Sequence, residues 1–104
     1  VESVDKKIKE QTFFIKNLTV DAQNLIPRAN TPEAKATVNK VYDAIRYSDP
    51  MSNDNLNEIE GRIGYEFKTF EMAVKSGDTA VIESQAEELL ILIHNRNNKC
   101  KALK

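Results

Sequence analysis

The stretch Leu89-Leu90-Ile91-Leu92-Ile93 decides the fold of this chain, because it places an unbroken apolar run inside a longer helical repeat. A helix that is apolar on every side is usually covered on more than one side. The run is far shorter than the roughly 20 apolar residues that a helix needs to cross a bilayer. It therefore predicts the central helix of a small soluble bundle, with no membrane span in these residues.

The pattern around this run predicts two helices joined by a tight turn. The repeat that contains the run predicts a helix over residues 78–101, with Asp78 as its N-cap. A second apolar repeat predicts a helix over residues 52–76, which Gly77 ends by adopting the left-handed conformation. Because so short a turn reverses the chain, the two helices are expected to be antiparallel neighbours.

The first half of the chain predicts two more helices. Apolar residues at alternating steps of three and four predict one long helix over residues 2–26, which Pro27 ends because proline disfavours the helical conformation of the residue before it. A further helix is predicted over residues 32–47. Thr31 can cap its first turn, and Pro32 fits its first position because the N–H that proline lacks would be unpaired there.

Three polar or small residues interrupt these helical patterns. Gly61 and Gly64 each cost a helix about 0.5–1 kcal/mol relative to alanine, so they predict either the close approach of a neighbouring helix or a weak, bendable turn. Gln11 stands on the apolar seam of the first helix. A polar residue at such a position usually sets the register of packing or pairs with another polar group.

Four helices with short connections predict an all-α fold, namely an antiparallel up-down four-helix bundle. A chain of 104 residues, 40% hydrophobic and 30% charged, is expected to form one domain over residues 1–104. The sequence begins at Val1 without a methionine, so excision from a longer chain and an upstream membrane anchor both stay open. The single cysteine, Cys100, excludes an internal disulfide and favours a reducing, cytoplasmic or cytoplasm-facing location.

The charges of the chain nearly balance, but they are unevenly distributed. Fifteen basic and sixteen acidic residues give a net charge of -1, which predicts no binding to nucleic acid. Residues 51–94 hold nine carboxylates against three basic residues, whereas the final ten residues hold four basic ones. These terminal cations either balance the partial negative charge at the end of the last helix or form a small docking surface for an acidic partner or an anionic headgroup.

His94 is the one histidine, and its surroundings do not favour chemistry. Phosphotransfer domains are also four-helix bundles with one exposed histidine, but that family usually places a lysine and then small residues where this chain has Asn95 and Arg96. A di-metal bundle would need a glutamate three residues before the histidine, where Ile91 stands. We therefore expect no catalytic residue, no metal site and no cofactor.

The best candidate for a site is the polar cluster at the ends of the second and fourth helices. Arg46 and Asp49 close the second helix, and Arg96 lies near the end of the fourth. In an up-down bundle these two ends meet, so Arg96 can bond to Asp49 or to the unpaired carbonyls of the second helix. The cluster is interpreted either as a structural clasp or as a speculative binding site for a small molecule or an anion.

These observations leave two classes of function. The first is a non-enzymatic helical module for protein interaction or assembly, of a bacterial type, that binds a protein partner or a second copy of itself. Four apolar residues lie off the main seams and could form a second apolar surface: Phe13, Val20, Met72 and Val81. The alternative is a regulatory bundle that binds a small molecule or an anion at the polar cluster.

Overall fold

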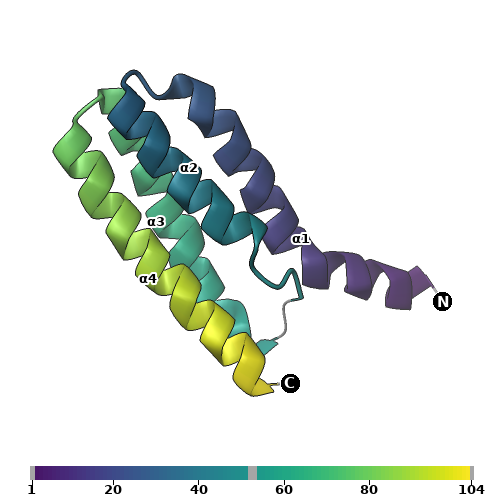
Figure 1. Cartoon of the computed structure of the whole chain (residues 1–104). Coiled ribbons are helices and arrows are strands. Elements are labelled where there is room, and N and C mark those ends of the chain that lie inside the picture. The colour runs from purple at the N-terminus through teal and green to yellow at the C-terminus, as the bar shows by residue number, and fades with distance from the viewer. Residues whose placement is uncertain (1, 52–53, 104) are drawn as a thin grey trace.

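The computed structural model describes the backbone of residues 2–51 and 54–103, and the side chains of residues 13–51 and 54–102. It confirms the all-α four-helix bundle, and the described residues contain no strand (Figure 1). The helices are α1 (Glu2–Leu25), α2 (Pro32–Arg46), α3 (Asn57–Ser76) and α4 (Thr79–Leu103), with short 3-10 turns η1 (Ile26–Arg28) and η2 (Asp54–Leu56).

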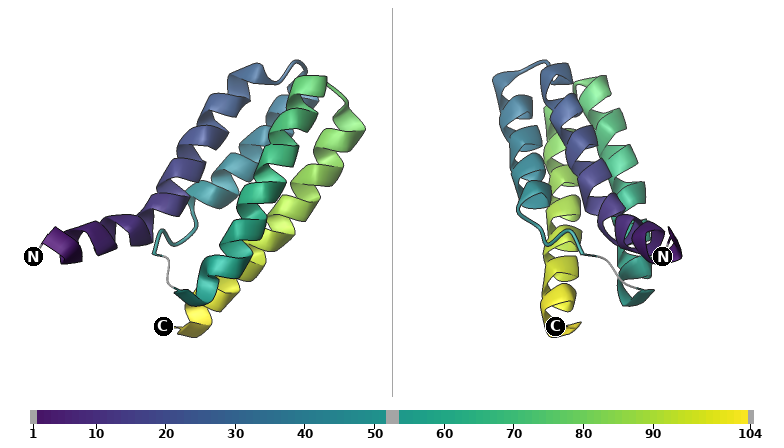
Figure 2. Two further views of the ribbon diagram at one scale, coloured as in Figure 1. Left: turned by 180° about the vertical axis from the view of Figure 1, so that it is seen from behind. Right: turned by 90° about the vertical axis from the view of Figure 1, so that its right-hand side faces the viewer.

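Successive helices run in opposite directions, and the N-terminal turns of α1 project beyond the end of the bundle (Figures 1 and 2). Helix α4 packs extensively against both α3 and α2, while α2 also packs against α1. Helices α2 and α4 are therefore parallel neighbours, and the connection from α2 to α3 joins helices on opposite corners of the bundle. This arrangement brings the C-terminal end of α2 beside the last turns of α4.

Local capping signals place three of the helix ends as predicted. The hydroxyl of Thr31 accepts a hydrogen bond from the N–H of Ala34 at 3.1 Å, and Pro32 begins α2. The carboxylate of Asp78 accepts one from the N–H of Ala80 at 3.1 Å in the first turn of α4. Gly77 ends α3 with a φ of 79°, in the left-handed region.

The start of α3 differs most from the prediction, and the C-terminal ends of α1, α2 and α4 each differ by one or two residues. Helix α3 begins at Asn57 rather than at residue 52, because the chain first forms the 3-10 turn η2 and no side chain caps the helix at Leu56. Ser52, whose residue type could cap the predicted helix, lies outside the described residues. Pro27 ends the α-helical part of α1 but is itself accommodated in the 3-10 turn η1.

The core is continuous and takes residues from all four helices. Within the deciding stretch, Leu89 and Ile93 are buried, and Leu90 and Leu92 are half-buried against the core. Ile91 differs, since 61% of its surface is exposed. The expectation of a helix covered on more than one side therefore holds for four residues of the run, and the fifth is an apolar side chain on the surface.

The two glycines inside α3 do not serve close helix packing. A Cβ atom built at Gly61 or at Gly64 would meet no other group of the described residues within 4 Å. The predicted close approach of a neighbouring helix is therefore wrong, because both residues face open space. The side chain of Gln11, which interrupts the seam of α1, lies outside the described side chains.

Candidate functional site

Arg96 occupies a core position of α4, and its side chain is fully buried. Its Nε donates to the Glu60 carboxylate at 2.9 Å, forming an ion pair between α4 and α3. The guanidinium then reaches the connection that follows α2. One terminal nitrogen donates to the backbone carbonyl of Asp49 at 2.8 Å, and the other donates to that of Met51 at 3.1 Å.

Neighbouring side chains extend this network to the last turn of α2. The Asn97 amide donates to the Ser48 hydroxyl at 3.1 Å, and that hydroxyl donates to the carbonyl of Ala44 at 2.7 Å. The thiol of Cys100 lies 3.8 Å from the Met51 carbonyl. We call this network the Arg96 clasp; its members are Ser48, Asp49, Met51, Glu60, Arg96 and Asn97.

The Arg96 clasp has the chemistry of a structural hydrogen-bond network that links helices. A buried charge is tolerated when it is paired and its hydrogen-bonding groups are satisfied. All three guanidinium nitrogens of Arg96 donate to protein acceptors, and Glu60 balances its charge. A planar guanidinium suits this role because its donors form a rigid fork that can serve several acceptors at once.

The structure brings together two of the three predicted site residues. Arg96 meets Asp49 through the backbone carbonyl of Asp49, whose carboxylate instead accepts from the N–H of Met51 at 3.0 Å. Arg46 lies on the surface, with its guanidinium carbon 6.0 Å from the ring centre of Tyr42 and 5.2 Å from that of Tyr47. This geometry favours the structural interpretation of the cluster for Arg96 and Asp49.

Glu60, the ionic partner of Arg96, is not among the site residues predicted from the sequence. A signal was present, because Glu60 stands four residues after Leu56 and three before Ile63, a spacing that places it on the apolar side of α3. Glu60 and Arg96 are both buried, at 7% and 0% exposure. Opposite charges on the inward seams of neighbouring helices indicate a buried pair.

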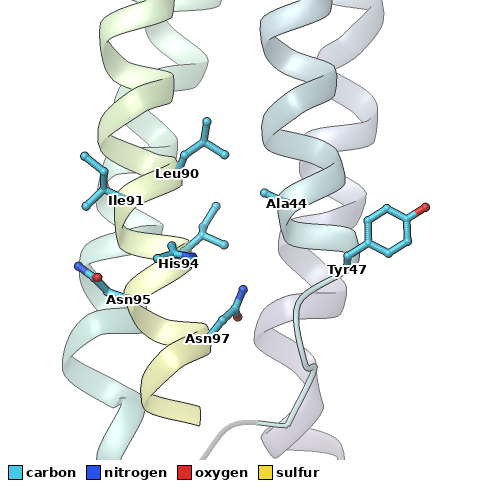
Figure 3. A pocket seen from close by; sticks show the side chains of 8 residues that line it. Ala44, Tyr47, Leu90, Ile91, His94, Asn95 and Asn97 are labelled. Atoms are coloured by element: carbon cyan, nitrogen blue, oxygen red, sulfur yellow. The ribbon is translucent and has the colours of Figure 1, made fainter. Parts of the chain in front are cut away.

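Beside the clasp, a groove opens between the C-terminal ends of α2 and α4 (Figure 3). Its volume is about 510 Å³. We call it the α2–α4 groove; it is lined by Ala44, Tyr47, Leu90, Ile91, Ile93, His94, Asn95 and Asn97. The side chains of Ala44, Leu90 and Asn97 point into the space between the helices, whereas those of Ile91 and Asn95 extend from the side of α4 that faces away from α2 (Figure 3).

The lining of the groove suits a polypeptide better than a charged small molecule. Its walls are mainly aliphatic, and its polar groups are the amides of Asn95 and Asn97 with the imidazole of His94. No lysine, arginine or carboxylate lines it among the described residues. Amides can donate to and accept from a peptide backbone, while aliphatic walls bury apolar side chains.

A smaller groove of about 300 Å³ lies between α1 and α3, and its lining includes Phe13, Phe14 and Gly64. The four residues predicted to form a second apolar surface are all exposed: Phe13, Val20, Met72 and Val81. Exposed apolar residues are therefore present on both sides of the bundle.

Within the described part of the chain, no group of three or more histidine, cysteine, aspartate or glutamate residues could hold a metal ion. No helix among those residues is long and apolar enough to cross a membrane. No family model, curated protein or solved structure matches the chain.

Proposed function

We propose that this chain is a non-enzymatic helical interaction module that binds an apolar polypeptide segment in the α2–α4 groove. The observation that carries the proposal is Ile91, an apolar residue that is 61% exposed and belongs to the lining of the α2–α4 groove. Tyr47 is 76% exposed and lines the same groove. Exposed apolar residues that gather at a concave surface are typical of interaction sites.

The Arg96 clasp supports the proposal because it fixes the walls of the groove. It ties the end of α2 to α4 through Ser48 and Asn97, and Asn97 also lines the groove. A binding surface on packed helices that are held in place loses little conformational entropy when a partner docks. In this proposal the clasp is scaffold and the groove is the site.

The alternative function, a regulatory bundle that binds a small molecule or an anion at Arg46, Asp49 and Arg96, has less support. An anion at Arg96 would compete with Glu60 and with two backbone carbonyls for the guanidinium. Arg46 has an exposed guanidinium, but it lies on the aromatic rings of two tyrosines. The reducing, cytoplasmic location belongs to the proposal as well, and the free thiol of Cys100 supports it.

The test is a peptide selection on the purified chain. A displayed library of apolar peptides is selected on the wild type, and each binder is measured on Ile91→Asp and on Tyr65→Asp, which changes an exposed apolar residue of α3. We expect binders whose affinity falls at least tenfold with Ile91→Asp and stays unchanged with Tyr65→Asp. An equal loss with both variants, or binding of inorganic phosphate at Arg46 in place of peptides, would contradict the proposal.

A further inference from the structure

The outer face of α4 divides into an acidic half and a basic half. Residues 79–93 contain glutamates and no lysine or arginine, whereas residues 94–103 contain basic residues and no carboxylate. Between the halves, exposed Ile91, His94 and Asn95 lie on the solvent side of the helix. The charged residues on either side are exposed too: Glu83, Glu87, Glu88, Lys99 and Lys101.

Helical geometry places these charges in two rows. Glu88 and Lys99 are eleven residues apart, close to three full turns at 3.6 residues per turn, so they lie on one side of the face. Glu87 and Lys101 are fourteen residues apart, close to four turns, and lie on the other side. Each row has a carboxylate at one end and an ammonium group at the other, with Ile91 between the rows.

Because the proposed function leaves the partner open, this pattern can be used to choose one. We propose that the partner on this face is a second copy of the chain, whose α4 lies antiparallel across the first about a two-fold axis near Ile91 and Asn95. The proposal rests on the proposed function, because Ile91 belongs both to this face and to the lining of the α2–α4 groove. Two-fold pairing places the glutamate of each row opposite the lysine of the same row in the other copy, and every contact occurs twice.

Two observations favour this occupant over an unrelated helix. Antiparallel pairing matches Glu88 with Lys99 and Glu87 with Lys101, whereas parallel pairing would set like charges against each other. The net charge of -1 adds little repulsion between copies. Ile91 of each copy is then covered near the centre, beside the groove that we assign to binding.

The size of the contact sets the expected strength. A single helix pairing buries less than the roughly 1,200–2,000 Å² of a standard interface, so we expect a dissociation constant on the order of 10 µM. Exposed ion pairs are screened by salt, so the dimer is expected to weaken as ionic strength rises from about 0.05 to 0.5 M.

Charge reversal tests the pairing directly. The first variant combines Glu87→Lys with Glu88→Lys, and the second combines Lys99→Glu with Lys101→Glu. Sedimentation velocity should show each variant by itself dimerising at least tenfold more weakly than the wild type. An equimolar mixture of the two should dimerise again, because every reversed residue then faces an opposite charge.

The control reverses Lys35 and Lys40, which are exposed on α2, to glutamate and changes the net charge by the same amount as the second variant. It should dimerise like the wild type. Ile91→Asp provides a variant that leaves all four pairs in place and should still weaken the dimer. Circular dichroism of each variant shows that it is folded.

Three results would overturn the self-pairing: a wild type that stays monomeric at about 1 mM, far above the expected dissociation constant; single variants that dimerise like the wild type; or a mixture that stays monomeric. The peptide selection separates this failure from that of the proposed function. A monomeric wild type that still yields binders sensitive to Ile91→Asp refutes the self-pairing but keeps the groove as a site. A monomeric wild type without such binders refutes both.

Discussion

At the scale of single residues, Arg96 shows why a charge can occupy a core position of this bundle. Desolvating a guanidinium is costly, and the cost is offset where its donors find acceptors and a counter-charge is in contact. Glu60 provides the counter-charge, and the chain leaving α2 provides carbonyls that have no helical partner. The arginine therefore holds the α2–α3 connection against α4. An apolar side chain at this position would leave those carbonyls without this donor.

Replacing Arg96 with lysine tests whether the fork of donors matters or the charge is sufficient. The lysine side chain is shorter and ends in a compact ammonium group instead of a planar fork of donors. Arg96→Lys is therefore expected to leave at least one of the Asp49 and Met51 carbonyls without its donor. We expect a loss of about 2–3 kcal/mol in the free energy of unfolding, measured by urea denaturation. The matched control, Arg46→Lys on the surface, should change stability by less than about 0.5 kcal/mol. Equal effects would show that the clasp does not contribute as described.

At the scale of elements, α3 contains helix-weakening residues that its packing does not require. Open space surrounds the position of a Cβ at Gly61 and at Gly64. We therefore expect Gly61→Ala and Gly64→Ala each to raise the free energy of unfolding by about 0.5–1 kcal/mol, because alanine restricts the unfolded chain and favours the helix.

Gly77 is the internal control for this experiment. Its φ of 79° is a conformation that side chains with a Cβ disfavour, although a Cβ there would lie at an ordinary 3.7 Å from the Asn30 amide. Gly77→Ala is expected to cost about 1–2 kcal/mol. Thermal unfolding followed by circular dichroism compares the three variants, and a destabilising effect at Gly61 or Gly64 would show that a side chain there is not accommodated.

The sequence predicts those elements whose signals are local. Thr31, Gly77 and Asp78 act on the backbone within a few residues of themselves, so their roles follow from residue type and position. The start of α3 was misplaced because several residues that can cap a helix precede a 3-10 turn. Local patterns do not distinguish which of them the chain uses.

Those contacts of the site that depend on the directions of the helices can be predicted from the sequence. Those features that depend on how side chains pack cannot. The meeting of Arg96 with the end of α2 followed from the up-down order of the helices. The outward position of Arg46 follows from its place next to buried Ile45 on α2. The α2–α4 groove depends on how side chains about 50 residues apart fill the space between two helices, which apolar periodicity does not encode.

At the scale of the whole molecule, the groove is space that the bundle leaves unfilled. Burying apolar surface by close packing stabilises a fold. The aliphatic groove of about 510 Å³ therefore leaves apolar surface unburied that further packing within the chain could cover. In the proposed function that space is kept for a partner. Filling it from within should therefore stabilise the chain and weaken binding.

Ala44→Leu is the variant that fills it, because the Ala44 side chain points into the groove opposite Leu90 (Figure 3). The added methyl groups can bury apolar surface against Leu90 and Ile93, and we expect a gain of about 1 kcal/mol, or about 5 °C in Tm. The same change should weaken groove-dependent peptide binding at least tenfold, measured by calorimetric titration. Ala36→Leu, on an exposed position of α2, is the control and should change neither quantity. A variant with higher Tm and unchanged binding would mean that partners do not enter the groove, since the space they need is the space that the leucine takes.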